Sequence, residues 1–210
     1  MKGTILTVAQ QKGGAGKTTL VAQLAVALAA KGRRVACVDI DPQGSLGAWS
    51  ALRARAGQYR RIDVVTSPGW KLDMTLGELA RGFDIVLVDS PPHAETEARV
   101  AVRAARFVLV PCQPSLLDVW ASRATLDLVR RERREAAILW NRLPPRGHVV
   151  DEAKAAAAEA GLAALEDGLG NRSDFARSLH VGAGVVETAP RGAAAREIRA
   201  LAATLAPRLA

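Results

Sequence analysis

A glycine-rich segment near the amino terminus constrains the fold more than any other part of the chain. Residues 11–19 (QKGGAGKTT) join a short apolar run at 4–9 to a long alanine-rich run at 17–30. Glycines let such a connection curl until successive N–H groups point inward at phosphate oxygens, and the amino end of a following helix adds partial positive charge. The segment therefore predicts a phosphate-binding loop between a buried strand and a helix.

The rest of the chain repeats the alternation of strand and helix. The expected strands are 4–9, 34–39, 62–66, 84–89, 107–111 and 136–141. The expected helices are 17–30, 44–55, 74–81, 95–105, 115–133, 150–160, 172–180 and 191–206. Several strands are apolar almost throughout, as strands covered on both faces are. We therefore expect one α/β domain over residues 1–210, a P-loop NTPase fold with a mostly parallel, twisted sheet and helices on both faces.

Composition narrows the class of protein. Apolar residues make up 49% of the 210 residues and aromatic residues only 4%, which favours helices packed on a sheet over an aromatic-rich all-β domain. No apolar run reaches the roughly 18 residues of a membrane span, and the start lacks the pattern of a signal peptide. Cys37 and Cys112 lie in apolar runs, so we expect buried free thiols in a cytoplasmic protein.

The chain is strongly basic, with 29 Lys and Arg residues against 21 Asp and Glu residues. Arginine outnumbers lysine, and an arginine-rich surface suits partners that carry phosphate. The excess is uneven, because residues 99–148 hold ten arginines and four acidic residues. A solvated basic face without a partner would have the same composition, so charge alone leaves both interpretations open.

Two lysines of the loop differ in what they predict. Lys17 is placed to reach the β and γ phosphates of a nucleotide, and the Thr18 hydroxyl is placed to ligate Mg²⁺. The usual loop pattern has a glycine where this chain has Gln11, and a second lysine, Lys12, stands five residues before Lys17. This K-G-G-x-G-K-T arrangement is the deviant Walker A signature. Spacing alone leaves open whether Lys12 is more than another basic residue near an anionic ligand.

Three further segments accompany the loop. They are 37–44 (CVDIDPQG), 85–93 (IVLVDSPPH) and 109–115 (LVPCQPS). In order and approximate spacing they resemble the D-x-D-P-Q-G, D-x-P-P and V-P-x-Q-P segments of ParA-type partition ATPases, in the MinD/ParA superfamily. The resemblance covers essentially the whole chain and is most specific over residues 4–115. It points to the small class that lacks an N-terminal DNA-binding domain.

The resemblance implies a site for ATP and Mg²⁺. The positions that match its nucleotide contacts are Gly13, Gly14, Ala15, Gly16, Lys17, Thr18, Thr19 and, at the adenine edge, Asn141. Thr18 and Asp89 match its magnesium site, where Asp89 acts through water, and Asp39 supports either the loop or the magnesium shell. Asp41 matches the carboxylate that orients the attacking water, and Lys12 and Lys17 complete the catalytic set. Asp39 and Asp41 also suit the simpler role of turn formers after a strand.

The resemblance also implies how such a protein works. ATP would hold two protomers together as a homodimer, with Lys12 of each reaching the nucleotide of the other. The dimer would bind DNA without sequence preference, and a ParB-like or other cargo-adaptor protein would stimulate a slow hydrolysis of ATP to ADP and phosphate. The cargo would be a plasmid, a chromosome or a protein cluster, and the protein would associate with the nucleoid.

Two sets of arginines are candidates for the DNA contacts. The resemblance points to Arg172, Arg177, Arg191 and Arg196. Charge density instead points to Arg130, Arg131, Arg133 and Arg134. The second set would also be explained as a solvated helix end, where cations are favourable. The first set is preferred, because DNA binding should depend on ATP through dimerisation. A patch that is complete on the monomer would bind DNA without ATP.

Two other classes of function share the phosphate loop. A MinD-like membrane-cycling ATPase would need an amphipathic membrane helix, and residues 193–209 offer a meagre apolar stripe without an aromatic residue. We therefore expect no membrane partner. An ATP-dependent synthetase would need an additional substrate pocket, and an iron–sulfur reductase would need two exposed cysteines per chain.

The tryptophans are scattered and predict packing more than function. The four are Trp49, Trp70, Trp120 and Trp140. Trp120 follows the V-P-x-Q-P turn, so contact with a partner protein is an alternative role for it.

Overall fold

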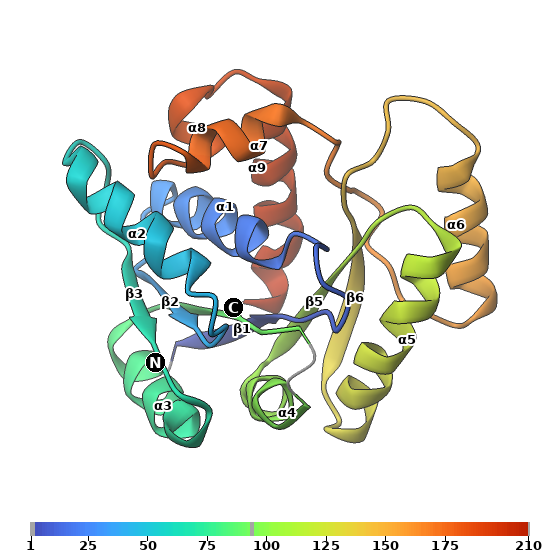
Figure 1. Ribbon diagram of the computed structural model, residues 1–210, viewed down its shortest axis with the longest axis horizontal. Helices are drawn as coiled ribbons and strands as arrows, with labels where there is room; N and C mark the ends of the chain where they lie inside the picture. Colours follow the sequence, from blue (N-terminus) through green and yellow to red (C-terminus); the bar gives the residue numbers. More distant parts are fainter. Residues whose placement is uncertain (1–2, 93–94, 210) are drawn as a thin grey trace.

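A computed structural model describes residues 3–92 and 95–209 of the chain, so that His93, the last residue of the 85–93 segment, lies outside the described residues. The core is a six-stranded sheet with the order β3-β2-β4-β1-β5-β6, and every neighbouring pair is parallel (Figure 1). The strands are β1 (Thr4–Val8), β2 (Val35–Asp39), β3 (Asp63–Thr66), β4 (Ile85–Asp89), β5 (Phe107–Cys112) and β6 (Glu135–Trp140). Each predicted strand is present within one or two residues, which confirms the predicted fold class.

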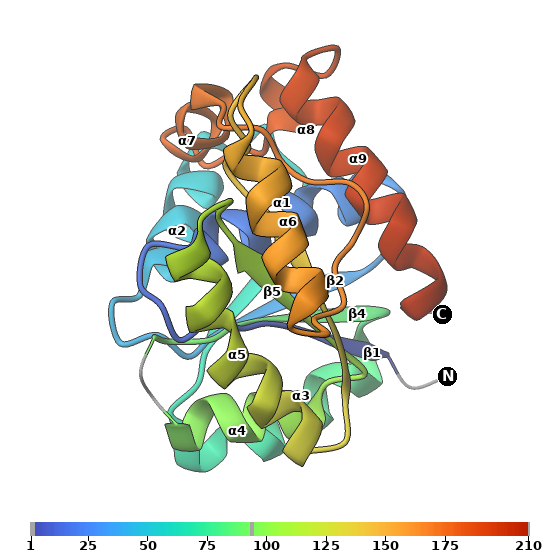
Figure 2. The ribbon, with the colours of Figure 1, turned by 90° about the vertical axis from the view of Figure 1, so that its right-hand side faces the viewer.

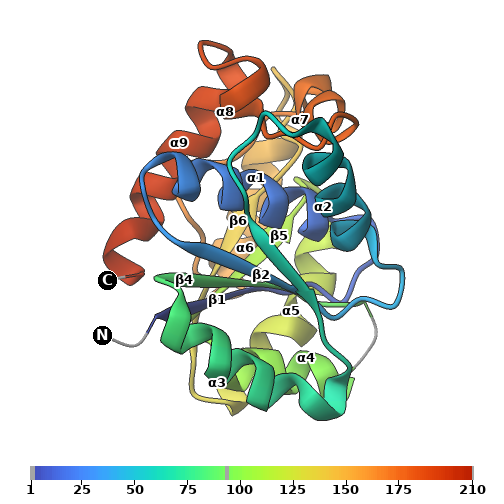
Figure 3. The ribbon, with the colours of Figure 1, turned by 90° about the vertical axis from the view of Figure 1, so that its left-hand side faces the viewer.

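Helices cover both faces of the sheet. They are α1 (Lys17–Ala30), α2 (Ser45–Ala56), α3 (Leu72–Gly82), α4 (Glu95–Ala104), α5 (Leu116–Arg131), α6 (Val149–Glu159), α7 (Ser173–Leu179), α8 (Val185–Thr188) and α9 (Ala193–Leu205). One core cluster joins the sheet to α1, α2, α7, α8 and α9, and two others join the opposite face to α3 to α6. Figures 2 and 3 show these two layers from the sides of the sheet.

The carboxyl-terminal part departs somewhat from the prediction. The helix expected at 172–180 is α7, and a single extra turn, α8, follows it. One turn is too short to show a 3.6-residue period, so the sequence pattern could not reveal it. The last helix ends at Leu205, and a 3₁₀ turn at Ala206–Arg208 contains Pro207.

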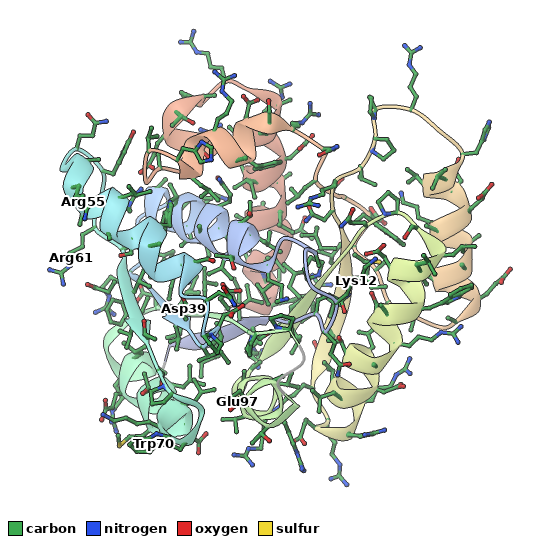
Figure 4. All side chains as sticks on the ribbon, viewed as in Figure 1. Lys12, Asp39, Arg55, Arg61, Trp70 and Glu97 are labelled. Atoms are coloured by element: carbon green, nitrogen blue, oxygen red, sulfur yellow. The ribbon has the colours of Figure 1, made fainter. Side chains whose placement is uncertain are left out.

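Two of the four tryptophans do not pack in the core. Trp49 and Trp140 are 4% and 1% exposed, as predicted, whereas Trp70 is 85% and Trp120 is 53% exposed. The prediction of packing is therefore wrong for Trp70, which projects from the start of the α3 region (Figure 4), and for Trp120 on α5. Both cysteines are free and buried, as predicted. No helix in the described ranges is long and apolar enough to cross a membrane.

Candidate nucleotide-binding site

The carboxyl edge of the sheet holds the phosphate loop. The loop leaves β1 after Val8 and enters α1 at Lys17. Gly14 and Gly16 have φ angles of 75° and 90°, which lie in the left-handed region where a side chain would be strained. A Cβ atom on Gly16 would also lie 2.7 Å from Asn141 Nδ2. Both glycines are therefore required by the backbone that forms the cradle.

Lys17 brings a buried cation to this cradle. The residue is 7% exposed, and its Nζ donates a hydrogen bond to the Gln10 carbonyl at 3.0 Å. Burial lowers the pKa of Lys17, while the charges of Asp89 and Asp41 act in the opposite direction. A buried ammonium held by a carbonyl is stabilised further by an anion, so the position fits a phosphate ligand.

Thr18 and Asp89 meet beside Lys17. The Thr18 hydroxyl donates to Asp89 Oδ2 at 2.6 Å. Burial raises the pKa of Asp89 to about 7, against the effect of the Thr18 hydrogen bond, and the charge of Asp39 raises the pKa further. The other carboxylate oxygen, Asp89 Oδ1, is buried and has no hydrogen-bond partner among the described residues. An uncompensated carboxylate oxygen next to a hydroxyl fits Mg²⁺, which prefers oxygen ligands.

The described part of the chain has no group of three or more His, Cys, Asp or Glu side chains that could hold a metal ion. Mg²⁺ commonly takes only one or two protein ligands and completes its shell with water and substrate phosphates. Thr18 and Asp89 would therefore hold it together with a bound nucleotide.

Asp39 and Asp41 occupy the segment between β2 and α2. Asp39 is fully buried, and its two oxygens accept from the backbone N–H groups of Asp41 and Gly47, each at 3.1 Å. Figure 4 shows Asp39 in the interior, near the end of the sheet strands. Asp41 is half-buried and accepts from the Gln43 N–H at 2.9 Å. Asp39 thus shapes the turn that carries Asp41, whose carboxylate has one oxygen outside this hydrogen bond.

Lys12 points away from the cradle, toward α5. Its Nζ lies 2.8 Å from Asp118 Oδ2, and the Lys12 side chain is 39% exposed (Figure 4). Asp118 also accepts from the Ser115 hydroxyl, and its own N–H donates back to that hydroxyl at 3.1 Å, which caps α5. In the chain alone, Lys12 is therefore held at the surface by an ion pair and not by the cradle of its own loop.

Sequence reasoning missed the residues that attach the loop to α5. The Gln10 side chain is 2% exposed and donates to Ser122 Oγ at 2.9 Å. Thr125 Oγ1 donates to Gln10 Oε1 at 3.2 Å and accepts from the Gln11 N–H at 3.2 Å. Asp118, Ser122 and Thr125 are four and three residues apart, so they share one helix face. The only sign of this contact in the sequence is the spacing of these three polar residues within the predicted helix.

Asn141 closes the other side of the loop. It follows β6, is 9% exposed and donates from Nδ2 to the Ala15 carbonyl at 2.8 Å. A cavity of about 440 Å³ lies beside it, lined in part by Gly16, Thr19, Arg172 and Phe175. The cavity adjoins the amino end of α1 and is of a size that suits a nucleoside next to the phosphate cradle.

The candidate DNA-binding arginines lie on the α7–α9 region. Arg172 pairs with Glu197 of α9 at 2.6 Å, and Arg177 is exposed on α7. Arg191 is exposed just before α9, and Arg196 donates to its carbonyl at 2.7 Å. The structure thus brings the four arginines to neighbouring elements, which pack together at one end of the molecule (Figure 1).

The alternative run of arginines has mixed surroundings. Arg130 pairs with Asp127 at 3.1 Å, and Arg131 lines a cavity that also includes Arg99 and Gln11. Arg133 and Arg134 face a different cavity, at the amino end of β6.

Comparison with known proteins places the chain in a family. Residues 6–205 match the family model of the CobQ/CobB/MinD/ParA nucleotide binding domain. The chain belongs to this family. Among its relatives is the maintenance of carboxysome distribution protein A of Halothiobacillus neapolitanus, 29% identical over 93% of both chains. The protein of the same name from Gloeobacter kilaueensis is 37% identical over 77% of this chain and 74% of its own length.

A solved structure agrees in fold. A Cyanothece McdA variant in complex with ATP superposes with a TM-score of 0.81 at 18% identity, and the match covers 98% of this chain and 97% of that one. The family model and the relatives confirm the resemblance found in the sequence: the chain is a nucleotide-binding positioning ATPase of the ParA/MinD kind. Among the solved neighbours, the Cyanothece McdA variant holds ATP and the MinD of Pyrococcus horikoshii holds Mg-ADP.

Proposed function

We propose that residues 1–210 act as one ATPase domain that dimerises with ATP, binds DNA without sequence preference and positions a cargo. The observation that carries the proposal is the second lysine of the loop. The Lys12 side chain lies at the surface, paired with Asp118 of α5, while Lys17 enters the cradle. A cation that its own site does not use is available to a nucleotide on a second copy of the chain.

The chemistry follows from where the side chains lie. Lys17 and the N–H groups of residues 13–19 would hold the phosphates, and Asn141 would contact the adenine edge. Thr18 and Asp89 would hold Mg²⁺, which neutralises charge on the β and γ phosphates. Asp41 would orient the attacking water from the turn that Asp39 supports. Positioning of this kind supplies little covalent chemistry, which is consistent with slow turnover and stimulation by a partner.

The surface around Lys12 supports dimerisation. Leu116, Leu117 and Trp120 of α5 are 42%, 67% and 53% exposed, and they flank Asp118, the residue that holds Lys12. Large apolar side chains gathered at one helix end favour burial against another protein surface. The apolar group and Lys12 lie on the same part of the molecule, as a face that meets a second copy requires.

The experiment compares Lys12→Ala with wild type by analytical ultracentrifugation in ADP and in ATP. Lys12→Ala is expected to bind nucleotide as a monomer, since Lys17 is unchanged, and to fail to dimerise with ATP. Two triphosphates that face each other repel strongly unless cations lie between them. Lys154→Ala, which removes an exposed lysine of α6, is the control and should dimerise normally. Normal ATP-dependent dimerisation of Lys12→Ala would refute the role of Lys12 across the interface.

The last helix, α9, does not support a MinD-like membrane anchor. Ile198, Leu201 and Leu205 of α9 are at most 1% exposed and belong to the main core cluster. Their burial leaves α9 without the free apolar face that a MinD-like amphipathic anchor needs. We propose instead that Arg172, Arg177, Arg191 and Arg196 contact DNA in a nucleoid-associated, cytoplasmic protein, and that a ParB-like or other adaptor links it to a plasmid, chromosome or protein cargo.

A further inference from the structure

A basic cavity lies at the end of the sheet that is opposite to the nucleotide site. It has a volume of about 280 Å³ and is lined by Arg106, Arg133, Arg134, Glu135, Pro207 and Arg208. Arg106 directly precedes β5, and Glu135 is the first residue of β6. Because the strands are parallel and the phosphate loop follows the carboxyl end of β1, one strand length, roughly 20 Å, separates the two sites.

The four arginines reach this cavity from three separate parts of the chain. Arg106 comes from the turn after α4, Arg133 and Arg134 come from the turn after α5, and Arg208 comes from the 3₁₀ turn after α9. Among the residues that the structure describes, no carboxylate lies within ion-pair distance of any of the four. Glu135 is the only acidic residue of the lining, so the cavity keeps a surplus of positive charge.

The negative ends of two helices do not cancel this surplus. The carboxyl end of α5 and that of α9 each contribute about half an elementary negative charge. At α5 the end carbonyls are satisfied, because Arg133 N–H donates to the Arg130 carbonyl at 3.0 Å and Arg134 N–H donates to the Val129 carbonyl at 3.1 Å. Four guanidinium groups therefore outweigh Glu135 and both helix ends.

Arg133 occupies a backbone position that normally favours glycine. Its φ angle is 54°, in the left-handed region, at the residue that closes α5. Glycine is the usual residue at such a helix end because it has no Cβ to strain. An arginine there adds a cation to the cavity at the expense of backbone strain.

Arg208 is held in place by its surroundings. Its guanidinium lies 5.2 Å from the centre of the Phe107 ring and donates to the Thr204 carbonyl at 3.1 Å. A guanidinium that is already ordered loses less conformational entropy when it binds a ligand.

We propose that this cavity binds a phosphoryl group of a ligand, and that this binding does not depend on which nucleotide occupies the phosphate loop. Guanidinium groups recognise phosphate oxygens through paired, charge-assisted hydrogen bonds, and several converging arginines suit a group with more than one negative charge. The phosphoryl group belongs either to a free oxoanion or to the backbone of a nucleic acid. The site is separate from the α7–α9 surface proposed above for ATP-dependent DNA binding.

The test uses the full chain with saturating Mg²⁺ and ADP, so that the phosphate loop is filled. Pyrophosphate is titrated by calorimetry, and a labelled DNA duplex is titrated by fluorescence anisotropy, both at roughly 50 mM salt, where exposed charges are weakly screened. The variant Arg106→Gln/Arg133→Gly is expected to bind about tenfold more weakly than wild type. Arg55→Gln removes an exposed arginine near the end of α2, on the other side of the molecule (Figure 4), and should bind as wild type.

Arg133→Gly separates binding from folding. It removes a cation and also relieves the left-handed strain, so its midpoint of thermal unfolding is expected to be unchanged or raised while binding falls. A loss seen with pyrophosphate alone assigns the site to a free oxoanion, and a loss seen with the duplex assigns it to a nucleic acid backbone. The proposal is overturned if neither probe binds wild type, or if the double variant binds both as wild type does. Neither result depends on whether ATP dimerises the protein.

Discussion

Asp89 is the residue at which burial and charge conflict most clearly. It is 1% exposed, and burial raises its pKa from an ordinary value of 3.8 to about 7. Between these two values the folded protein keeps a proton that the unfolded chain releases. The free energy of unfolding therefore falls as the pH rises from about 4 to about 7, and above that range the loss is complete.

We expect Asp89→Asn to remove this pH dependence in protein free of nucleotide and Mg²⁺. At about pH 8 the variant should be more stable than wild type, by on the order of 2 kcal/mol, while at about pH 5 the two should be closer. Urea denaturation across this range measures the difference. Asp167→Asn, at an exposed carboxylate, should follow the wild-type curve. A wild-type stability that does not decline toward pH 8 would contradict the assignment of a raised pKa to Asp89.

The sequence predicted residues of the candidate site but not their local partners. Lys17, Thr18 and Asp89 were predicted to gather, and the structure brings Thr18 and Asp89 into direct contact. Asp118 and Ser122 were not predicted, because each meets the loop across more than a hundred residues of chain. Motifs record the chemistry of a site, whereas contacts between distant elements depend on how the helices pack.

At the scale of elements, α5 is the helix that holds the phosphate loop. Thr125 makes two of the hydrogen bonds between them, one to the Gln10 side chain and one from the Gln11 N–H. The Gln10 side chain is buried, so water cannot replace a lost partner there. The shape of the loop thus depends on a helix that contributes none of the residues predicted for the nucleotide site.

Thr125→Val tests this dependence, because valine keeps the shape of threonine and removes the hydroxyl. We expect a loss of stability of about 1–2 kcal/mol, together with weaker binding of ADP, since Gln10 and Gln11 lead directly into the loop. Urea denaturation and calorimetric titration of ADP measure the two effects. Thr96→Val, at an exposed position on α4, should change neither. Full ADP affinity in Thr125→Val would show that the loop keeps its shape without α5.

Helix α2 shows that the sequence pattern of a helix does not determine which of its charged side chains are buried. The helix itself was predicted, but Arg53 within it is 4% exposed, between the rings of Trp49 and Tyr59. It pairs with Glu187 of α8 at 2.7 Å and donates to the Gly182 carbonyl at 3.0 Å. An arginine is predicted to be exposed unless its partners are known, and here Glu187 and the Gly182 carbonyl lie more than 120 residues away in the chain.

At the scale of the whole molecule, the class of fold was predictable and the order of the strands was not. Apolar runs and their spacing indicate parallel strands with helices between them, as observed. The sheet, however, places β4 between β2 and β1, although β4 follows β3 in the chain. Periodicity within one segment carries no information about which other segment lies beside it. The same limit applies to the arginines at 130–134, of which Arg131 lines one cavity and Arg133 and Arg134 line another.

The largest test at this scale concerns DNA. We expect the ATP-bound dimer to bind duplex DNA much more tightly than the ADP form, because dimerisation doubles the α7–α9 surface. Arg191→Ala/Arg196→Ala removes roughly four phosphate contacts from a dimer, so the slope of log affinity against log salt should fall by about 3–4. Arg172 is a weaker choice for this test, because Glu197 already holds its guanidinium.

Anisotropy titrations in ATP and in ADP, at several salt concentrations, measure that slope. Arg61→Ala, which removes a strongly exposed arginine beside β3 (Figure 4), is the control and should leave the slope unchanged. A double change at Arg130 and Arg131 tests the alternative surface. Loss of binding only in that second variant would move the DNA contact to α5, where a monomer could bind as well as a dimer. Equal affinity for DNA in ATP and in ADP would contradict the proposal that ATP controls DNA binding, because counterion release from a fixed surface does not depend on the nucleotide.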